Sequence, residues 1–144
     1  MEQEALTAVE RVIFLKSIDI FEHATVEELG RVAALTEEVH FKPGETIYRE
    51  GEPVDAIYFV LSGHAVVEKN GHRMLEVGEK QAIGTVAALD RNPAVHTVKV
   101  VDPIHALKLN VQDFDDILSL DFELVHAVFR ALCRMIREFQ SSRG

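Results

Sequence analysis

The sequence has no tryptophan, four prolines and a single cysteine in 144 residues. Because Cys133 has no second cysteine to pair with, no disulfide framework can form, which is typical of a protein from a reducing compartment. No apolar run approaches the roughly 20 residues that a membrane-spanning helix needs. The acidic N-terminus also lacks the apolar core of a secretory signal peptide. We therefore expect a cytoplasmic protein without a membrane span.

Basic residues are outnumbered, since 15 lysines and arginines stand against 24 aspartates and glutamates and give a formal net charge of -9. Non-specific nucleic-acid binding depends on basic side chains that neutralise phosphates, so we expect no nucleic-acid partner. The apolar content of 47% is that of a folded globular chain. At this length we expect one domain over residues 1–144.

The sequence lacks the patterns of metal and catalytic sites. It has seven histidines but no His-x-His pair, which a cupin-type metal site in a jelly roll requires. No Gly-x-Ser-x-Gly nucleophile elbow occurs either. We expect no metal, no cofactor and no catalytic residue, and hence no enzyme. A metal-dependent, cupin-like enzyme stays as an alternative that metal analysis of the purified protein would test.

A period-two pattern of apolar residues begins at residue 37 and continues to about residue 110. Asn70-Gly71 lies between two such runs and is typical of a tight hairpin turn. Ser62-Gly63 and Asp102-Pro103 each separate two predicted strands. Short strands with glycine and proline at the corners predict a β-sandwich or a jelly roll. The strands are expected at residues 37–41, 46–48, 56–61, 65–67, 74–77, 97–101 and 104–109.

Apolar residues at helical spacing flank this region on both sides. The N-terminal pattern predicts a helix over residues 5–16 and a second helix opened by a capping box of Thr25 and Glu28. The C-terminal pattern predicts a short helix over residues 111–118 and a long one over residues 122–140. In the second helix we expect an inward row of Leu29, Val32, Ala33 and Leu35.

The long C-terminal helix has two apolar rows. The first row steps by three and four residues, as in a coiled-coil seam, and holds Phe122, Val125, Phe129, Leu132, Ile136 and Phe139. The second row holds Leu124, Val128, Ala131 and Met135. One row is enough to dock the helix on its own chain, so we expect the first row to meet the same helix of a second subunit in a homodimer. The alternative is one wide stripe buried within a single chain.

Residues 83–98, IGTVAALDRNPAVHTV, interrupt the strands with one helical turn. We expect Thr85 to cap this turn and the chain to return to a strand at His96-Thr97. Pro93 should end the turn, because proline has no amide N–H to donate. A helical turn between two strands leaves free N–H groups at its start, and such groups can bind an anion.

This segment resembles the phosphate-binding cassette of the cyclic nucleotide-binding domain family, the β-roll of the catabolite activator protein and the protein kinase A regulatory subunit. The family's pattern is Phe-Gly-Glu, a short apolar helix, Pro-Arg, one or two small residues and a Thr-Val strand. Gly84, residues 86–89, Pro93, Thr97 and Val98 fit it. Outside the segment, the family's landmarks are PGE from Pro43, EG from Glu50 and the run YFVLSGHAVV. The resemblance extends over about residues 21–139.

The resemblance implies a mainly β fold with flanking α-helices. We expect an antiparallel β-roll, which is a double-stranded β-helix or jelly roll, with N-terminal helices and a long C-terminal helix. Residues 1–35 would form the N-terminal helices, residues 36–110 the roll, and residues 111–140 the C-terminal helices. Family members that act as transcription factors carry a helix-turn-helix domain after the long helix. The sequence to residue 144 has no room for one, so we expect no DNA-binding domain.

Two positions depart from the family's pattern. Thr85 stands where the family has the Glu that holds the ribose hydroxyl, and Ala94 stands where it has the Arg that pairs with the cyclic phosphate. Losing such a charged partner costs on the order of 2–5 kcal/mol, so we expect tight cAMP or cGMP binding to be lost. The candidate contacts left for a weaker or different small-molecule ligand are Gly84, Thr85, Val86, Ala87, Ala88, Arg91, Ala94, Val95, His96 and Thr97.

Two functions are consistent with this sequence. The first is a regulatory sensor module in which, as the resemblance implies, binding at the cassette shifts the C-terminal helix. The second is a ligand-free module for protein interaction or dimerisation, alone or within a larger protein. Placing Glu and Arg at positions 85 and 94 separates the two, because cyclic nucleotide binding returns only if the pocket is open.

Overall fold

The structure is a computed structural model that describes residues 5–143, with side chains to residue 142. The chain divides into two compact units, which we describe separately. Within the described residues, one unit combines residues 5–34 with residues 114–143 and is helical; the other comprises residues 35–113 and contains all the described strands. None of the described helices combines the length and the apolar composition that crossing a bilayer requires.

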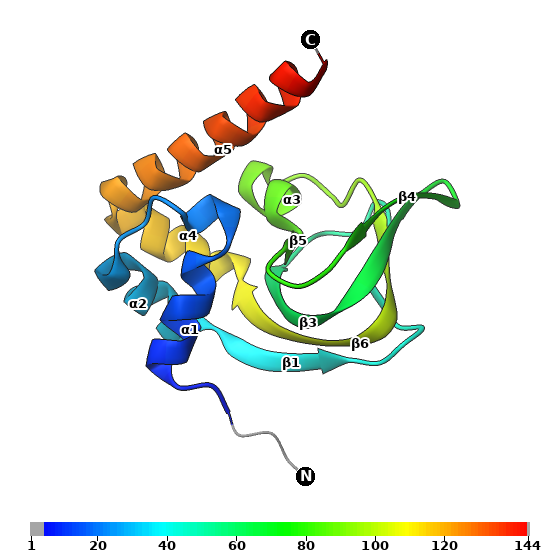
Figure 1. Ribbon diagram of the computed structural model, residues 1–144, viewed down its shortest axis with the longest axis horizontal. Helices are drawn as coiled ribbons and strands as arrows, with labels where there is room; N and C mark the ends of the chain where they lie inside the picture. The colour runs from blue at the N-terminus through cyan, green and yellow to red at the C-terminus, as the bar shows by residue number, and fades with distance from the viewer. Residues whose placement is uncertain (1–4, 144) are drawn as a thin grey trace. The chain divides into compact units, whose positions relative to one another are not determined.

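Residues 35–113 form an antiparallel β-roll, as the sequence predicted (Figure 1). Strands β1, β6, β3 and β4 are neighbours in that order, while β2 pairs with β6 and β5 pairs with β3. Every one of these pairings is antiparallel. The strands are β1 (Glu37–Phe41), β2 (Thr46–Tyr48), β3 (Ala56–Lys69), β4 (His72–Val77), β5 (Ala82–Ile83) and β6 (Thr97–Asn110).

The two long strands β3 and β6 correct the sequence analysis, which ended strands at Ser62-Gly63 and at Asp102-Pro103. Each strand runs through its predicted break and is 14 residues long in all. The pairing between β3 and β6 shifts register near Ser62. Gly63 has a φ of +89°, and a Cβ there would lie 2.0 Å from the carbonyl oxygen of Pro103. The glycine therefore allows the two strands to bulge at close approach and remain paired.

The β3–β4 hairpin confirms its sequence prediction. Asn70 and Gly71 have φ values of 53° and 78°, as a two-residue turn with both central residues left-handed requires. The strands that they join pair from Lys69 and His72 to Ala65 and Val77.

The interior of the roll is apolar, with two tyrosine hydroxyls among the side chains. The rings of Phe41 and Tyr58 meet edge to face at 5.2 Å, and the centroids of Tyr48 and Tyr58 are 5.9 Å apart. The Tyr48 hydroxyl donates to the Ala56 carbonyl and accepts the Ala56 N–H. Burial raises the pKa of both tyrosines, so both stay neutral at ordinary pH. The rest of the buried cluster is Val60, Ala65, Val77, Ile83, Val98, Val100, Ile104 and Ala106.

The N-terminal helices begin at capping boxes. Thr25 Oγ1 accepts the Glu28 N–H, and Glu28 Oε1 accepts the Thr25 N–H, so the predicted box at the start of α2 (Val26–Leu35) is confirmed. A second box, at Thr7, starts α1 (Ala8–Lys16) three residues later than predicted. In α2, the predicted residues Leu29, Val32 and Ala33 are buried, but Leu35 is 40% exposed. The prediction that Leu35 faces inward is wrong, because it lies at the end of the helix.

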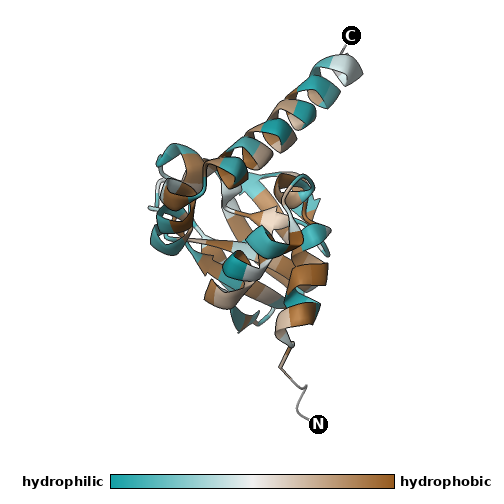
Figure 2. Ribbon diagram, turned by 90° about the vertical axis from the view of Figure 1, so that its left-hand side faces the viewer, coloured by the Kyte–Doolittle hydropathy of each residue, from teal (hydrophilic) through white to brown (hydrophobic). Residues whose placement is uncertain are grey.

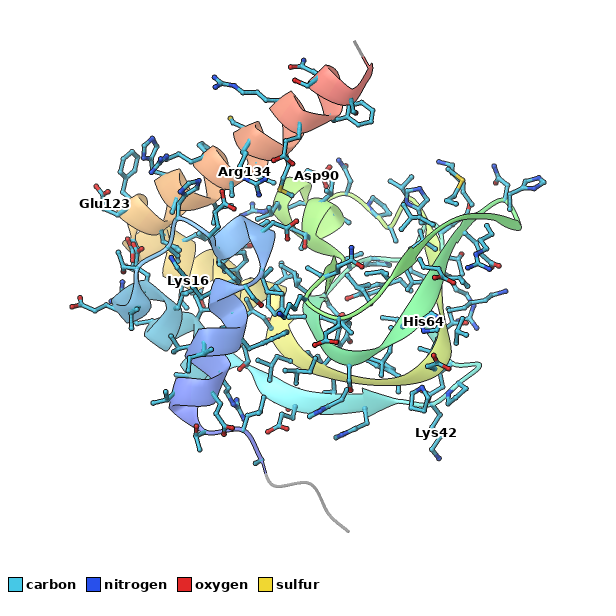
Figure 3. All side chains as sticks on the ribbon, in the orientation of Figure 1. Lys16, Lys42, His64, Asp90, Glu123 and Arg134 are labelled. Atoms are coloured by element: carbon cyan, nitrogen blue, oxygen red, sulfur yellow. The ribbon has the colours of Figure 1, made fainter. Side chains whose placement is uncertain are left out.

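Contacts within the helical unit fix the connector after α1. This connector is a 3-10 helix, η1 (Asp19–Phe21). Lys16 Nζ donates to the carbonyls of Glu22 and Ala24 at 2.9 and 2.7 Å, and Lys16 is labelled in Figure 3. Phe21 packs edge to face on Phe114, with the ring centroids 6.0 Å apart.

The two C-terminal helices are α4 (Val111–Leu120) and α5 (Phe122–Arg143), so both extend two or three residues beyond their predicted ends. Asp121 links them, since its Oδ1 accepts the Leu124 N–H at 3.0 Å. Its other oxygen, Oδ2, lies 2.5 Å from Arg31 of α2. These contacts hold the pKa of the Asp121 carboxyl below its usual range, and the hydrogen bond from the Leu124 backbone N–H contributes most.

Candidate functional site

Residues 83–98, which we call the cassette segment, contain the predicted helical turn as α3 (Thr85–Asp90) between β5 and β6. Its N-cap is Gly84, with a φ of 93°, so the prediction that Thr85 is the N-cap is wrong. A Cβ at Gly84 would lie 3.2 Å from the Ala56 carbonyl oxygen and from Tyr48 Cε2. The left-handed backbone and these close neighbours together require glycine, and Thr85 becomes the first helical residue.

Thr85 places a hydroxyl where nothing bonds to it. Its Oγ1 atom is buried and has no hydrogen-bond partner among the described residues. A buried hydroxyl without a partner costs roughly 1–3 kcal/mol in protein interiors. The unsatisfied oxygen therefore marks a position at which a polar group of a ligand would gain a hydrogen bond.

The second half of the cassette segment is tied to the loop between β2 and β3. Ala94 donates its N–H to the Glu52 carbonyl and accepts the Gly51 N–H at its own carbonyl, both at 2.8 Å. Thr97 Oγ1 accepts the Glu50 N–H at 3.1 Å. The strand β6 begins at Thr97, the first residue of the predicted strand 97–101. Backbone and side-chain bonds thus fix the positions of the residues after the turn.

The predicted site residues differ in exposure. Ala88 is buried, and Ala94 packs against the apolar cluster inside the roll. Gly84 lies against the ring of Tyr48. Three predicted residues are exposed: Val86, Arg91 and Val95. Those that are partly buried are Gly84, Thr85, Ala87, Ala94, His96 and Thr97.

Several residues that lie against the cassette segment were not predicted from the sequence. Tyr48, Val54 and Ala56 supply the atoms nearest to Gly84, and the loop residues Gly51 and Glu52 bond Ala94. Alternating apolar residues indicated buried strands, but they did not indicate which side chains face α3. The landmark at Glu50 was the one signal that this loop belongs to the site.

No buried charge lies at the cassette segment. Across the part of the chain that the structure describes, Glu28 and Thr36 are, apart from the tyrosines, the only polar or charged residues that are buried. At position 94 the methyl group of alanine packs against the apolar cluster that includes Tyr48 and Val98. The segment therefore offers a ligand apolar contacts, backbone groups and one unsatisfied hydroxyl.

Two of the seven histidines, His64 and His105, form carboxylate pairs on the roll. His64 Nδ1 lies 2.7 Å from Asp102, and His105 Nε2 lies 2.8 Å from Glu38. The ring of His40 stacks on that of His105 at 4.4 Å. Among residues 5–143, no three histidine, cysteine, aspartate or glutamate side chains come together as metal ligands.

Helix α5 exposes one face and buries the other, and Figure 2 shows apolar and polar residues alternating along it. Leu124, Val128 and Ala131 of the predicted second row are buried, whereas Met135 is partly buried. In the first row, Val125 and Leu132 are also partly buried. Cys133 on the same helix is exposed. The exposed members of the first row are Phe122 at 76%, Phe129 at 61%, Ile136 at 57% and Phe139 at 61%.

Two curated relatives are much longer than this chain. An uncharacterized NTE family protein of Mycobacterium tuberculosis is 28% identical over 141 residues, which are 97% of this chain and 23% of that protein. The potassium channel KOR1 of Oryza sativa subsp. japonica is 30% identical over 114 residues, which are 76% of this chain and 13% of the channel. The chain thus spans less than a quarter of either relative.

Three solved structures share the fold. The regulatory domain of Toxoplasma gondii PKA with cAMP has a TM-score of 0.76 at 23% identity, over 91% of this chain and 50% of that one. The N-terminal domain of a Streptomyces coelicolor transcriptional regulator has a TM-score of 0.78 at 24% identity, over 89% and 95%. The regulatory subunit of a cAMP-independent protein kinase A from Trypanosoma cruzi, bound to guanosine, has a TM-score of 0.73 at 24% identity, over 81% and 42%.

The family match agrees with the fold and with the position of the helical turn. The family model described as "Cyclic nucleotide-binding domain" matches residues 38–121, from β1 through the end of α4. This range contains the whole cassette segment. The chain belongs to the cyclic nucleotide-binding domain family.

Proposed function

We propose that this chain is a regulatory sensor module whose roll does not bind cAMP or cGMP tightly. The observation that supports this is Ala94, whose side chain packs against an apolar cluster at the position where the family's pattern has a phosphate-binding arginine. Without a buried cation, the cost of removing a cyclic phosphate from water is not offset. A missing charge-assisted pair weakens binding by about 2–5 kcal/mol, which is roughly 30-fold to 5,000-fold in Kd.

The ligand that suits this site is a small molecule with less negative charge than a cyclic nucleotide. Apolar surface around Tyr48 and the free hydroxyl of Thr85 favour a largely apolar ring with a few hydrogen-bonding groups. The related T. cruzi subunit is described as cAMP-independent and as bound to guanosine, an uncharged nucleoside. We therefore propose a neutral ligand of nucleoside size for this roll.

A thermal-shift and calorimetry comparison tests this proposal. The natural chain would be titrated with guanosine, adenosine, cAMP and cGMP under the same conditions. We expect a neutral nucleoside to raise the unfolding temperature more than the cyclic nucleotides do. The variant Thr85→Val removes the hydroxyl at nearly constant volume, and it should weaken nucleoside binding without unfolding the roll. Stronger binding of cAMP or cGMP than of every nucleoside would overturn the proposal.

The second candidate function is an interaction module without a ligand, and the exposed face of α5 favours it. Phe122, Phe129 and Ile136 are each more than half exposed, and large exposed apolar patches mark interaction sites. We propose that a second copy covers these residues, so that the module is a homodimer through α5. Sedimentation analysis of the natural chain should give a dimer, and Phe129→Asp should give a monomer. Val26→Asp, at a residue 69% exposed on α2, is the matched control and should leave the dimer intact.

The remaining functional expectations are also proposals. We propose that the module has no catalytic activity of its own and does not bind nucleic acid, since its formal net charge is -9. The unpaired and exposed Cys133 is consistent with a reducing compartment, and we propose the cytoplasm.

A further inference from the structure

The centre of the exposed face of α5 differs from the predicted seam. An α-helix turns by about 100° per residue, so the side opposite the buried Leu124, Ala127, Val128 and Ala131 can be located. That side alternates Phe122, Phe129 and Ile136 with His126, Cys133 and Gln140, all of them exposed. We call these six residues the central stripe.

The two edges of the central stripe have opposite character. One edge is apolar and consists of Val125, Leu132 and Phe139. The other edge is charged and consists of Glu123, Arg130 and Arg137, all exposed. Figure 3 shows Glu123 directed outward at the N-terminal end of α5. None of these three charged side chains has an ion-pair partner within residues 5–142. The charged edge therefore runs from negative at its start to positive at its end.

We infer that the partner of this face is a second copy of the chain whose α5 runs antiparallel to the first. This inference rests on the homodimer proposed above and assigns its orientation. In an antiparallel pair, each helix edge meets the same edge of its partner. Glu123 then faces Arg137 of the partner subunit at both ends of the interface, and the apolar edge residues Val125, Leu132 and Phe139 meet their counterparts.

A parallel pair would match the same edges poorly. It would set each charged edge against the apolar edge of the partner, with Arg130 beside Val125 and Arg137 beside Leu132. The antiparallel pair has one like-charge contact, in which the two Arg130 side chains meet at the middle. Glu27 lines the same groove as Arg130 and supplies negative charge there. The two Glu123–Arg137 contacts and the continuous apolar edge favour the antiparallel arrangement.

Cross-linking of cysteine variants tests the orientation. In a Cys133→Ala background, one sample carries Glu123→Cys and another carries Arg137→Cys, and the two are mixed and treated with a short bis-maleimide. An antiparallel pair brings positions 123 and 137 of the two subunits together. In a parallel pair these positions lie 14 residues apart, about 21 Å at 1.5 Å per residue, which is out of reach. Lys69→Cys in the same background, at an exposed position on the roll, measures collisional cross-linking.

The expected result is a mixed 123–137 dimer well above the Lys69→Cys background. Charge reversal adds an independent readout: Glu123→Arg or Arg137→Glu alone should raise the dimer Kd by about 3-fold to 30-fold, and the double variant should restore it. A dimer in which the natural Cys133 residues form a disulfide and 123–137 cross-links are absent would show a parallel pair, overturning the orientation while keeping the homodimer. A monomer at every protein concentration would overturn both proposals.

Discussion

Replacing Ala94 by arginine should create cyclic nucleotide binding in this roll. The side chain at position 94 is partly buried and packs against the apolar cluster, and both backbone groups of Ala94 bond the loop residues Gly51 and Glu52. The position of the backbone is thus fixed before a ligand arrives. An arginine there would add a partly buried positive charge, which the exposed Arg91 of the cassette segment does not supply. Thr85→Glu adds the second contact that the family resemblance implies.

The expected gain can be estimated from the chemistry of the contact. A charge-assisted, bidentate arginine–phosphate pair in a partly desolvated site contributes about 2–5 kcal/mol, so Ala94→Arg should tighten cAMP binding roughly 30-fold to 5,000-fold. The ligand-free variant should unfold at a lower temperature, because a guanidinium next to apolar side chains is poorly solvated. At a cAMP concentration of about 100 times Kd, binding returns about 2.7 kcal/mol of stability.

Isothermal titration calorimetry with cAMP and cGMP measures this gain, with circular dichroism to confirm that the variant is folded. Val95→Arg is the matched control, since it adds the same charge one residue later on a side chain that is 52% exposed. It should change the affinity far less than Ala94→Arg. If the folded Ala94→Arg/Thr85→Glu variant binds no cyclic nucleotide at millimolar concentration, the roll is closed, and the reasoning from Ala94 is refuted.

Three further predictions concern the fold. Gly63→Ala should destabilise the roll by about 3 kcal/mol or more, because its Cβ would lie 2.0 Å from a backbone oxygen of β6. The control Gly44→Ala, at a glycine with the same φ whose added Cβ would have no atom within 4 Å, should cost about 1–2 kcal/mol. Urea denaturation measures the free energy of unfolding of both variants. Thr25→Ala should cost about 1 kcal/mol in the same assay, because it removes a capping box. The pKa of Asp121 is depressed in the folded state, so its contribution to stability is present above the carboxyl's unfolded pKa and is lost as the pH falls through the folded value. Asp121→Asn should therefore flatten the acid side of the stability–pH curve below about pH 4.

Each of these predictions has a contrary result. Equal losses for Gly63→Ala and Gly44→Ala would mean that steric contact at the bulge is not what requires glycine. A Thr25→Ala chain as stable as the natural one would mean that the capping box contributes nothing net. If the natural chain and Asp121→Asn lose stability in parallel below pH 4, the carboxyl's contacts do not stabilise the folded state.

Features that depend on neighbouring residues were predictable from the sequence. The capping box of Thr25 and Glu28 and the Asn70-Gly71 hairpin were both confirmed, because each is decided by residues within three positions of one another. Strand spacing predicted a β-sandwich or a jelly roll, and the resemblance narrowed this to the antiparallel roll. Such features need no knowledge of distant contacts.

Features decided by distant contacts were missed. Glycine and proline occur both where a strand ends and where it bulges, so the sequence does not distinguish the two cases. The close approach of Gly63 to Pro103 shows that the strands bulge there. Capping preferences favoured Thr85, but the atoms of Ala56 and Tyr48 around Gly84 shifted the cap by one residue. On α5, the centre of the exposed face could be located only once the buried residues of the helix were known.

The most direct test of the proposed function is calorimetric titration of the natural chain with cAMP and cGMP up to millimolar concentration. The proposal predicts no saturable binding at micromolar ligand, because the cassette segment has no buried positive charge to pair with the phosphate. A micromolar Kd for either nucleotide would contradict it and would show that backbone groups of the cassette segment bind the phosphate without an arginine at position 94.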